Sequence, residues 1–562
     1  MREKWWKDSV IYQIYIKSFQ DSNGDGVGDI GGIIKRIPYL KELGVDAVWM
    51  TPFMDSPNVD NGYDVRDYRR VLEEFGTMDD LRTMIRLFHE NGMKVIMDMV
   101  VNHSSNQHRW FQDAVKNEAS PYQNYYIWRK GKSEEQPPNN WNSFFSESAW
   151  TYVPERNKFY LHLFAKEQPD LNWENESLRK EVADIMKFWL EEGIDGFRMD
   201  VIGLIGKDIT FPDGTFENDL EMIGTQYYSN LPQTHQYLQE LRQRLDSEYN
   251  NIVFIGETTY ATVDDAYKYI CEKPELDMIL QSELMEVDAD TDKWIPKQAD
   301  LKEMKQIITK WQISHNGQIW NSIFLGNHDK PRCVSRFGNS VEYREKSAKL
   351  LSTLLLTLRG TPIIYQGDEL GMTNGEFEDI SQFDDVETRN FWNQEVVEKK
   401  RNAEEVMQII SRVSRDNSRT PMQWSEEKNG GFSTEKPWLR MNSNYHVINA
   451  VEEKKDLESV LNYYKDMIAL RKKFSALRTG KYQELLPDHP TVFSYFREDD
   501  ERRLWVVLNM SDHKVENISV PEVERKKVLC ISNDSERKLK GSLEKETKIS
   551  LSPWEADVWQ IE

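Results

Sequence analysis

The sequence predicts an α/β protein built on a (β/α)₈ TIM barrel. Eight short apolar runs recur over the first two thirds of the chain, and most are followed by an amphipathic helical pattern. Several helical patterns end at a glycine, the residue expected just past a helix C-terminus. Alternating strands and helices of this number favour a closed parallel barrel with active-site residues at the C-terminal ends of its strands.

The individual elements follow in order along the chain. The predicted strands are SVIYQIY from Ser9, VDAVWMTP from Val45, KVIMDMVVNH from Lys94, IDGFRMDV from Ile194, NIVFIGE from Asn251, LDMILQSEL from Leu276, SIFLGNHD from Ser322 and TPIIYQGDE from Thr361. Predicted helices between them include residues 31–44, 78–92, 177–193 and 342–360.

Three regions interrupt or follow the predicted barrel, which we expect over residues 1–103 and 173–480. Residues 104–172, rich in aromatic and polar residues, predict an inserted domain after the third strand. A charged helical insertion is expected near residues 374–424. Beyond residue 481 the short alternating runs, without helices, predict a C-terminal antiparallel β-sandwich over 481–562.

Composition limits the classes of partner. The formal net charge of -23 argues against nucleic acid, because phosphate contacts need clustered Lys and Arg. No stretch reaches the roughly 18 apolar residues of a membrane span, and the first residues lack a signal-peptide apolar region. Three widely spaced cysteines predict neither a disulfide framework nor a cysteine metal site. We therefore expect a cytoplasmic protein, a monomer or weak oligomer, with no membrane partner and a small neutral ligand.

Polar residues gather at the ends of the predicted strands. They are Asp98 and His103 after the third, Arg198 and Asp200 on the fourth, Glu257 on the fifth, and His328 and Asp329 on the seventh. Three carboxylates at one barrel mouth suit glycoside hydrolysis, in which one attacks the anomeric carbon and another protonates the departing oxygen. The alternative is a buried ion pair of Arg198 and Asp200 that only stabilises the barrel.

Four stretches, DMVVNH, GFRMDV, IGET and FLGNHD, resemble in order and spacing the four motifs of the α-amylase family of glycoside hydrolases (family 13). QPDLNWEN, DNGYDVRDY and RDNSRTPMQW resemble its oligo-1,6-glucosidase and α-glucosidase branch. The resemblance implies a retaining double displacement without an organic cofactor. Asp200 would be the nucleophile, Glu257 the acid/base, and Asp329 the residue that stabilises the transition state.

The same resemblance implies a closed pocket for one terminal glucose. His103, Arg198 and His328 would line it, and Tyr63 would stack on the sugar ring. Asp60 would pair with Arg415 and close the pocket, so that attack comes only from the non-reducing end. Gln168 lies in a segment that resembles this exo-acting branch. We expect Arg198 to lower the pKa of its neighbour Asp200, because a nearby cation favours the carboxylate.

Val201 follows the predicted nucleophile and is expected to continue the fourth strand. In the resembling enzymes valine here accompanies activity on α-1,6 links, which favours isomaltose and panose, with α-1,4 links as a further target. Trehalose-6-phosphate hydrolase and a sucrose- or maltose-preferring α-glucosidase remain alternatives. A non-catalytic barrel like the transporter heavy chains would lack the carboxylates. NHDKPRCVSRFGN lacks the charged string of sucrose isomerases, which favours hydrolysis.

DSNGDGVGD, from Asp21 to Asp29, resembles the start of an EF-hand loop, but Gly32 stands where an EF-hand needs glutamate. An oxygen cage from Asp21, Asn23, Asp25, the Val27 carbonyl and Asp29 is still available. The resembling enzymes carry a structural Ca²⁺ in this loop, and Mg²⁺ is an alternative occupant. The other interpretation is a solvated acidic turn.

Overall fold

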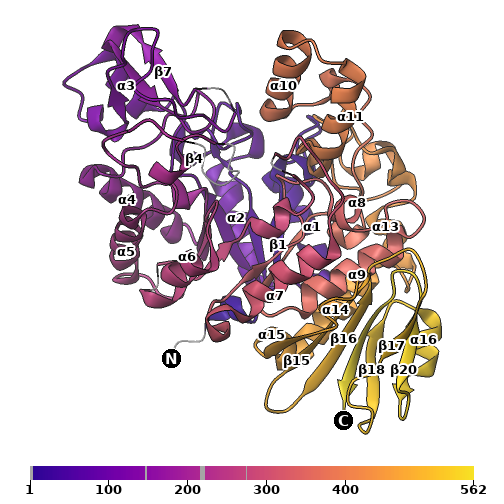
Figure 1. Cartoon of the computed structure of the whole chain (residues 1–562). Helices are drawn as coiled ribbons and strands as arrows, with labels where there is room; N and C mark the ends of the chain where they lie inside the picture. Colours follow the sequence, from indigo (N-terminus) through magenta and orange to yellow (C-terminus); the bar gives the residue numbers. More distant parts are fainter. Residues whose placement is uncertain (1–3, 146–147, 216–221, 274, 291) are drawn as a thin grey trace.

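The centre of the molecule is a barrel of eight parallel strands, seen in a computed structural model that describes residues 4–145, 148–215, 222–273, 275–290 and 292–562 (Figure 1). The strands are β1 (Ile11–Ile14), β2 (Ala47–Met50), β5 (Lys94–Met99), β9 (Gly196–Met199), β10 (Val253–Glu257), β11 (Met278–Leu280), β12 (Ser322–Ile323) and β13 (Thr361–Tyr365). Each lies within one of the eight predicted runs, so the predicted barrel is confirmed.

The barrel closes between β11 and β12, the two ends of the strand order β11-β10-β9-β5-β2-β1-β13-β12. There the Ser322 hydroxyl donates to the carbonyl of Ile279 at 2.5 Å. Every residue of β1 and β9 is buried, because parallel barrel strands lie between the packed interior and a layer of helices.

Helices follow the strands and cover the outside of the barrel. They are α1 (Ile30–Leu43), α2 (Met78–Glu90), α4 (Glu176–Glu191), α5 (Pro232–Asp246), α6 (Val263–Tyr267), α7 (Leu301–Gly317), α8 (Cys333–Phe337), α9 (Arg344–Thr357), α13 (Ala450–Lys455), α14 (Val460–Lys473) and α15 (Ser475–Arg478). The four predicted helices are α1, α2, α4 and α9. Gly44 ends α1 at a φ of 92°, a left-handed conformation that glycine adopts without strain.

Two insertions stand at one end of the barrel (Figure 1). The first follows β5 and contains α3 (Arg109–Lys116) and an antiparallel sheet of β6 (Trp128–Arg129), β8 (Lys158–Leu161) and β7 (Trp150–Val153). The second contains α10 (Val386–Trp392), α11 (Ala403–Val413) and α12 (Asp416–Arg419). The Asn390 amide of α10 donates to the carbonyl of Phe145 at 2.8 Å, so the two insertions touch. A smaller antiparallel pair, β3 (Met54–Asp55) and β4 (Asp67–Val71), follows β2.

The C-terminal region is antiparallel, as predicted. A six-stranded sheet has the order β14-β15-β16-β21-β18-β19, and a second sheet pairs β17 with β20. Their bounds are β14 (Lys481–Leu485), β15 (Val492–Glu498), β16 (Arg503–Asn509), β17 (Val515–Ser519), β18 (Lys527–Ser532), β19 (Ser542–Leu543), β20 (Lys548–Leu551) and β21 (Ala556–Ile561). Helix α16 (Ser535–Lys540) was not predicted; Asp534 caps it by accepting from the N–H groups of Glu536 and Arg537.

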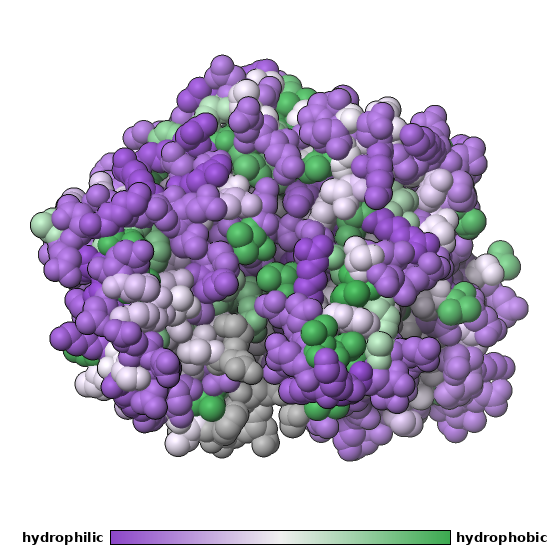
Figure 2. All heavy atoms as spheres, turned by 90° about the horizontal axis from the view of Figure 1, so that it is seen from above, coloured by the Kyte–Doolittle hydropathy of each residue, from purple (hydrophilic) through white to green (hydrophobic). Residues whose placement is uncertain are grey.

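The face that carries both insertions is mostly hydrophilic, and hydrophobic residues appear on it only in small separate groups (Figure 2). No helix in the described part of the chain is long and apolar enough to cross a membrane. Cys271, Cys333 and Cys530 are all free thiols.

Candidate active site

The predicted catalytic residues meet at the barrel mouth because neighbouring strands run in register. Arg198 of β9 is the Cα partner of Asp98 on β5. On its other side Arg198 pairs with Ile255 of β10, two residues before Glu257. Paired residues of parallel strands point to the same face of the sheet, so Asp98 and Arg198 extend together into the barrel.

Arg198 is the hub of the site and bonds three carboxylates. Its Nη1 donates to Asp98 Oδ1 at 2.5 Å and to Asp200 Oδ1 at 2.8 Å. Its Nη2 donates to Glu257 Oε2 at 2.6 Å. The Arg198 side chain is 2% exposed, so the cation of each ion pair is buried, where opposite charges attract more strongly than in water. One cation thereby holds the predicted nucleophile and the predicted acid on adjacent nitrogens.

The protonation of Asp200 differs from the sequence-based expectation. Burial raises the pKa of Asp200 well above its ordinary value, Arg198 opposes that rise, and Glu257, Asp98 and Asp329 add to it. Arg198 favours the carboxylate of Asp200 as expected, but the expected net lowering was wrong because burial and three neighbouring acids outweigh it. Acids that interact this closely titrate as a unit.

Val201 was predicted to continue β9, but the strand ends at Met199. The φ of 38° and ψ of 37° at Val201 are left-handed, a strained conformation for a β-branched residue. The turn aims the Val201 N–H at Glu257 Oε2, at 3.0 Å. Arg198 bonds the same oxygen, so both donors are directed at Oε2 of Glu257.

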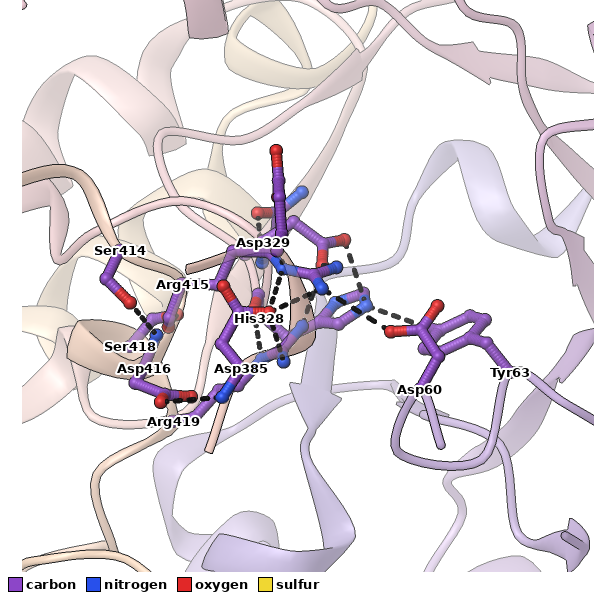
Figure 3. Close-up of polar contacts among 12 residues, drawn as sticks. Asp60, Tyr63, His328, Asp329, Asp385, Ser414, Arg415, Asp416, Ser418 and Arg419 are labelled. Carbon is purple, nitrogen blue, oxygen red and sulfur yellow. Dashed lines mark hydrogen bonds and ion pairs between the residues drawn. The ribbon is translucent and has the colours of Figure 1, made fainter. Parts of the chain in front are cut away.

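Asp329 lies on the opposite side of the mouth among three cation-capable groups (Figure 3). Its Oδ2 is 3.0 Å from His328 Nε2, and its Oδ1 accepts from Arg415 at 3.3 Å and from Arg419 at 3.0 Å. Burial alone would raise the pKa of Asp329, but His328, Arg415 and Arg419 together hold it well below its ordinary value. Asp329 is therefore ionised, as a group that stabilises an oxocarbenium-like transition state must be.

Tyr63 connects this side of the site to the Arg198 side. Its ring stacks on His328 with centroids 5.5 Å apart and planes 3° apart. Its hydroxyl lies 2.6 Å from His328 Nε2 and donates to Asp98 Oδ2 at 3.0 Å. Gln13 Nε2 of β1 lies 2.8 Å from the other ring nitrogen, so His328 is fixed at both ends.

Asp60 is buried between Arg415 and Gln168. Its Oδ1 accepts from Arg415 at 3.4 Å and its Oδ2 from Gln168 at 3.2 Å. Burial raises the pKa of Asp60 to about 6, against the opposing effect of Arg415 and Arg419. His103 Nε2 lies 3.0 Å from the carbonyl of Tyr63, and burial lowers the pKa of His103 to about 4, so its ring is neutral.

A continuous chain of contacts therefore links all of the predicted catalytic and substrate-binding residues. These are Asp60, Tyr63, His103, Gln168, Arg198, Asp200, Val201, Glu257, His328, Asp329 and Arg415. Three further members were missed. Arg419 stands four residues after Arg415, and that helical spacing was an available signal. For Gln13 and Asp385 the sequence offered none.

In the predicted metal loop, acidic side chains accept hydrogen bonds from the backbone of the same loop. Asp21 Oδ1 accepts from the N–H groups of Asn23 and Gly24 at 2.9 and 2.7 Å, and Asp25 Oδ1 accepts from that of Val27 at 2.8 Å. Asp29 Oδ1 instead accepts from Gly32 and caps α1. Within the described ranges no group of three or more His, Cys, Asp or Glu side chains gathers as a metal site would. The calcium ligand set stays a prediction.

A small cleft of about 60 Å³ lies beside Asp329. Charged residues dominate its lining, and they are Glu286, Asp288, Lys293, Asp329, Lys330, Arg336 and Arg412. Lys330 pairs with Glu286 at 2.6 Å, and Arg336 pairs with Asp288 at 2.6 Å. Lys293 pairs with Glu387, whereas Arg412 donates to the carbonyl of Lys297. The cleft is thus polar, and three of its four cations have acidic partners.

A barrel with an acid cluster of this kind at its mouth is typical of glycoside hydrolases, and the comparisons agree. Residues 13–480 match the model of the alpha amylase catalytic domain. The chain belongs to the alpha-amylase family and is a glycoside hydrolase.

Its relatives include several activities. It is 46% identical to the oligo-1,6-glucosidase of Parageobacillus thermoglucosidasius over 100% of both chains. Its fold matches the crystal structure of trehalose-6-phosphate hydrolase from Bacillus licheniformis, with a TM-score of 0.92, 42% identity and 99% of each chain covered. Isomaltulose synthase from Klebsiella sp. superposes with a TM-score of 0.94 at 40% identity over 100% of both chains.

Proposed function

We propose that this enzyme is a retaining, exo-acting α-glucosidase that removes terminal α-1,6-linked glucose from short oligosaccharides such as isomaltose and panose, and also accepts α-1,4 links. The observations that carry the proposal are an acid pair on one guanidinium and a contact of Asp60 with Arg415 that would close a pocket behind the terminal glucose. A bridge through one guanidinium is compatible with the roughly 5–5.5 Å carboxyl separation of retaining enzymes.

In the proposed mechanism Asp200 attacks the anomeric carbon while Glu257 protonates the departing oxygen. Asp329, ionised, stabilises the positive charge that develops on the ring. Glu257 then takes a proton from water, which attacks the glycosyl-enzyme and releases α-glucose. A pocket closed by the contact of Asp60 with Arg415 would admit one glucosyl unit, which supports action at chain ends.

The main alternative substrate is trehalose 6-phosphate, and the charges of the cleft beside Asp329 favour a neutral sugar instead. A phosphate site needs Arg or Lys donors that are available to it. Three of the four cations that line the cleft, Lys293, Lys330 and Arg336, are held by acids, so a phosphate entering it would meet carboxylates as well as cations. The oligo-1,6-glucosidase relative supports the same choice.

The test compares initial rates on isomaltose, maltose, sucrose and trehalose 6-phosphate for the purified protein. We expect kcat/KM to be highest for isomaltose, and long starch chains to be left intact. A higher kcat/KM for trehalose 6-phosphate would transfer the assignment to the phosphorylated substrate.

For the loop at Asp21, we propose a structural Ca²⁺, with Mg²⁺ as the alternative, held by oxygens of Asp21, Asn23, Asp25, Val27 and Asp29. Because an ion that binds only the folded state stabilises it by mass action, chelation should lower Tm and leave kcat at low temperature nearly unchanged. Calorimetry with and without chelator, with the exposed-site variant Asp25→Asn as a weakened binder, measures this. Loss of activity at unchanged Tm would contradict a structural role.

We further propose a cytoplasmic location and a monomer or weak oligomer. Three free thiols are typical of a reducing compartment. Sedimentation at micromolar concentration should give mainly the mass of one chain.

A further inference from the structure

Asp385 lies at the start of the helical insertion and bonds Arg415, the residue proposed to close the glucosyl pocket. Asp385, immediately before α10, is fully buried, and its Oδ1 accepts from Arg415 Nη2 at 2.6 Å and from Arg415 Nε at 2.9 Å (Figure 3). We propose that Asp385 is a positioning residue that holds the Arg415 guanidinium at the wall of the glucosyl pocket and so makes binding of the terminal glucose depend on the insertion. The inference rests on the proposed function.

The distances show which partner anchors Arg415. The double contact with Asp385 is short, whereas the contacts with Asp60 and Asp329 are 3.4 and 3.3 Å. Two hydrogen bonds from one guanidinium to one carboxylate oxygen are both charge-assisted, and such bonds are stronger than neutral ones. Asp385 therefore fixes the guanidinium, and the looser contacts leave its remaining N–H groups within reach of a sugar.

Asp385 also supplies negative charge between two neighbouring guanidinium groups. Arg415 and Arg419 both donate to Asp329 Oδ1, so two buried guanidinium groups lie side by side. Asp385 Oδ1 is also 3.8 Å from Arg419 Nη1 and acts as counter-ion to both. The neighbouring acid Asp416 makes no such bond; its Oδ2 accepts the N–H groups of Asp384 and Asp385 and fixes their backbone.

The two oxygens of Asp385 bond different partners, so a substitution can remove the charge that Arg415 meets and keep the helix cap. Oδ1 accepts from Arg415, while Oδ2 caps α10 by accepting from Thr388 N–H at 3.1 Å and Thr388 Oγ1 at 2.6 Å. Asp385→Asn keeps one oxygen for the cap and removes the charge that holds Arg415. Thr388→Val weakens the cap and leaves the Arg415 contact, so it is the matched control for a purely structural role.

The experiment is a double-mutant cycle of Asp385→Asn and Arg415→Met, measured with nitrophenyl α-glucoside and isomaltose. In the native background Asp385→Asn should raise KM on the order of 10-fold or more, with a smaller change in kcat. In the Arg415→Met background it should have no further effect, because Asp385 acts through Arg415. An equal loss in both backgrounds, or an unchanged KM, would overturn the proposal.

Thermal unfolding distinguishes an effect of the variants on the position of Arg415 from an effect on the stability of the fold. Thr388→Val should lower Tm without raising KM; a rise equal to that of Asp385→Asn would mean that the insertion acts only as a structural support. If Asp385→Asn does not fold, Asp385→Glu, which keeps the charge but displaces the carboxylate, should raise KM, and a native KM would refute the role. Wild-type protein inactive on isomaltose would refute the substrate assignment, while the nitrophenyl α-glucoside cycle would still report on Asp385.

Discussion

Arg198 illustrates how a single residue can set the chemistry of a whole site. It bonds Asp98, Asp200 and Glu257 at once, so the cluster contains more negative charge than its central cation can neutralise. Burial and the neighbouring acids raise the pKa of Asp200, while Arg198 opposes that rise. The left-handed turn at Val201 aims its N–H at the same Glu257 oxygen that Arg198 bonds.

Separate roles for Asp200 and Glu257 are expected to appear with a nitrophenyl α-glucoside. Glu257→Gln should lose on the order of 10²- to 10⁴-fold on a disaccharide, whose leaving oxygen must be protonated. With nitrophenol as leaving group it should still form the glycosyl-enzyme and then stall, giving a burst in stopped-flow absorbance. Asp200→Asn should give no burst and no turnover. β-Glucose as the first product by NMR would mean inversion and remove the nucleophile role.

At the scale of elements, two buried arginines, one from α14 and one from the C-terminal sheet, meet the end of helix α9 and bond only to carbonyls in the contacts described. Arg471 of α14 donates to the carbonyls of Leu356 and Leu358, and Arg497 of β15 donates to that of Thr357. The last carbonyls of a helix have no partner within it, and cations there also oppose the negative end of the helix dipole. The two side chains therefore end α9, and Arg497 docks the sheet on it.

Arg497→Met should consequently weaken this junction. Its other acceptors are the carbonyls of Leu477 and Gly480, and each buried carbonyl left unpaired costs roughly 1–3 kcal/mol. Part of that is offset because no buried charge remains. We expect a Tm several degrees lower with native kcat at low temperature. The exposed Arg502→Met serves as control, and an equal Tm for both variants would contradict the docking role.

At the scale of the whole molecule, buried neutral histidines make stability depend on pH. Burial lowers the pKa of His103 to about 4 and that of His108 to about 3, below the value of about 6.5 in an unfolded chain. Between pH 6.5 and 4 the unfolded state therefore takes up protons that the folded state refuses. The free energy of unfolding must fall as the pH falls through this window.

His108→Asn should reduce that dependence. The histidine caps α3 through Nδ1, which accepts from the Trp110 N–H at 3.1 Å, and asparagine can accept the same bond. From pH 6.5 to 4 the variant should avoid a loss on the order of 3 kcal/mol that the native chain suffers. Urea unfolding at several pH values measures the difference, with the exposed His513→Asn as control. Parallel curves for both variants and the native chain would contradict this account.

The sequence by itself determined the barrel strands, the order of the insertions and the identity of the acid residues. These depend on local signals: apolar runs, helical periodicity, and charged residues immediately after strands such as Asp200 and Glu257. Only the tertiary structure decided the partners. Arg198 serves three acids from three strands, Val201 leaves the strand to reach Glu257, and Asp385 meets Arg415 thirty residues away. Local patterns cannot specify such pairs, because burial and the distances between distant segments exist only once the chain has closed into the barrel.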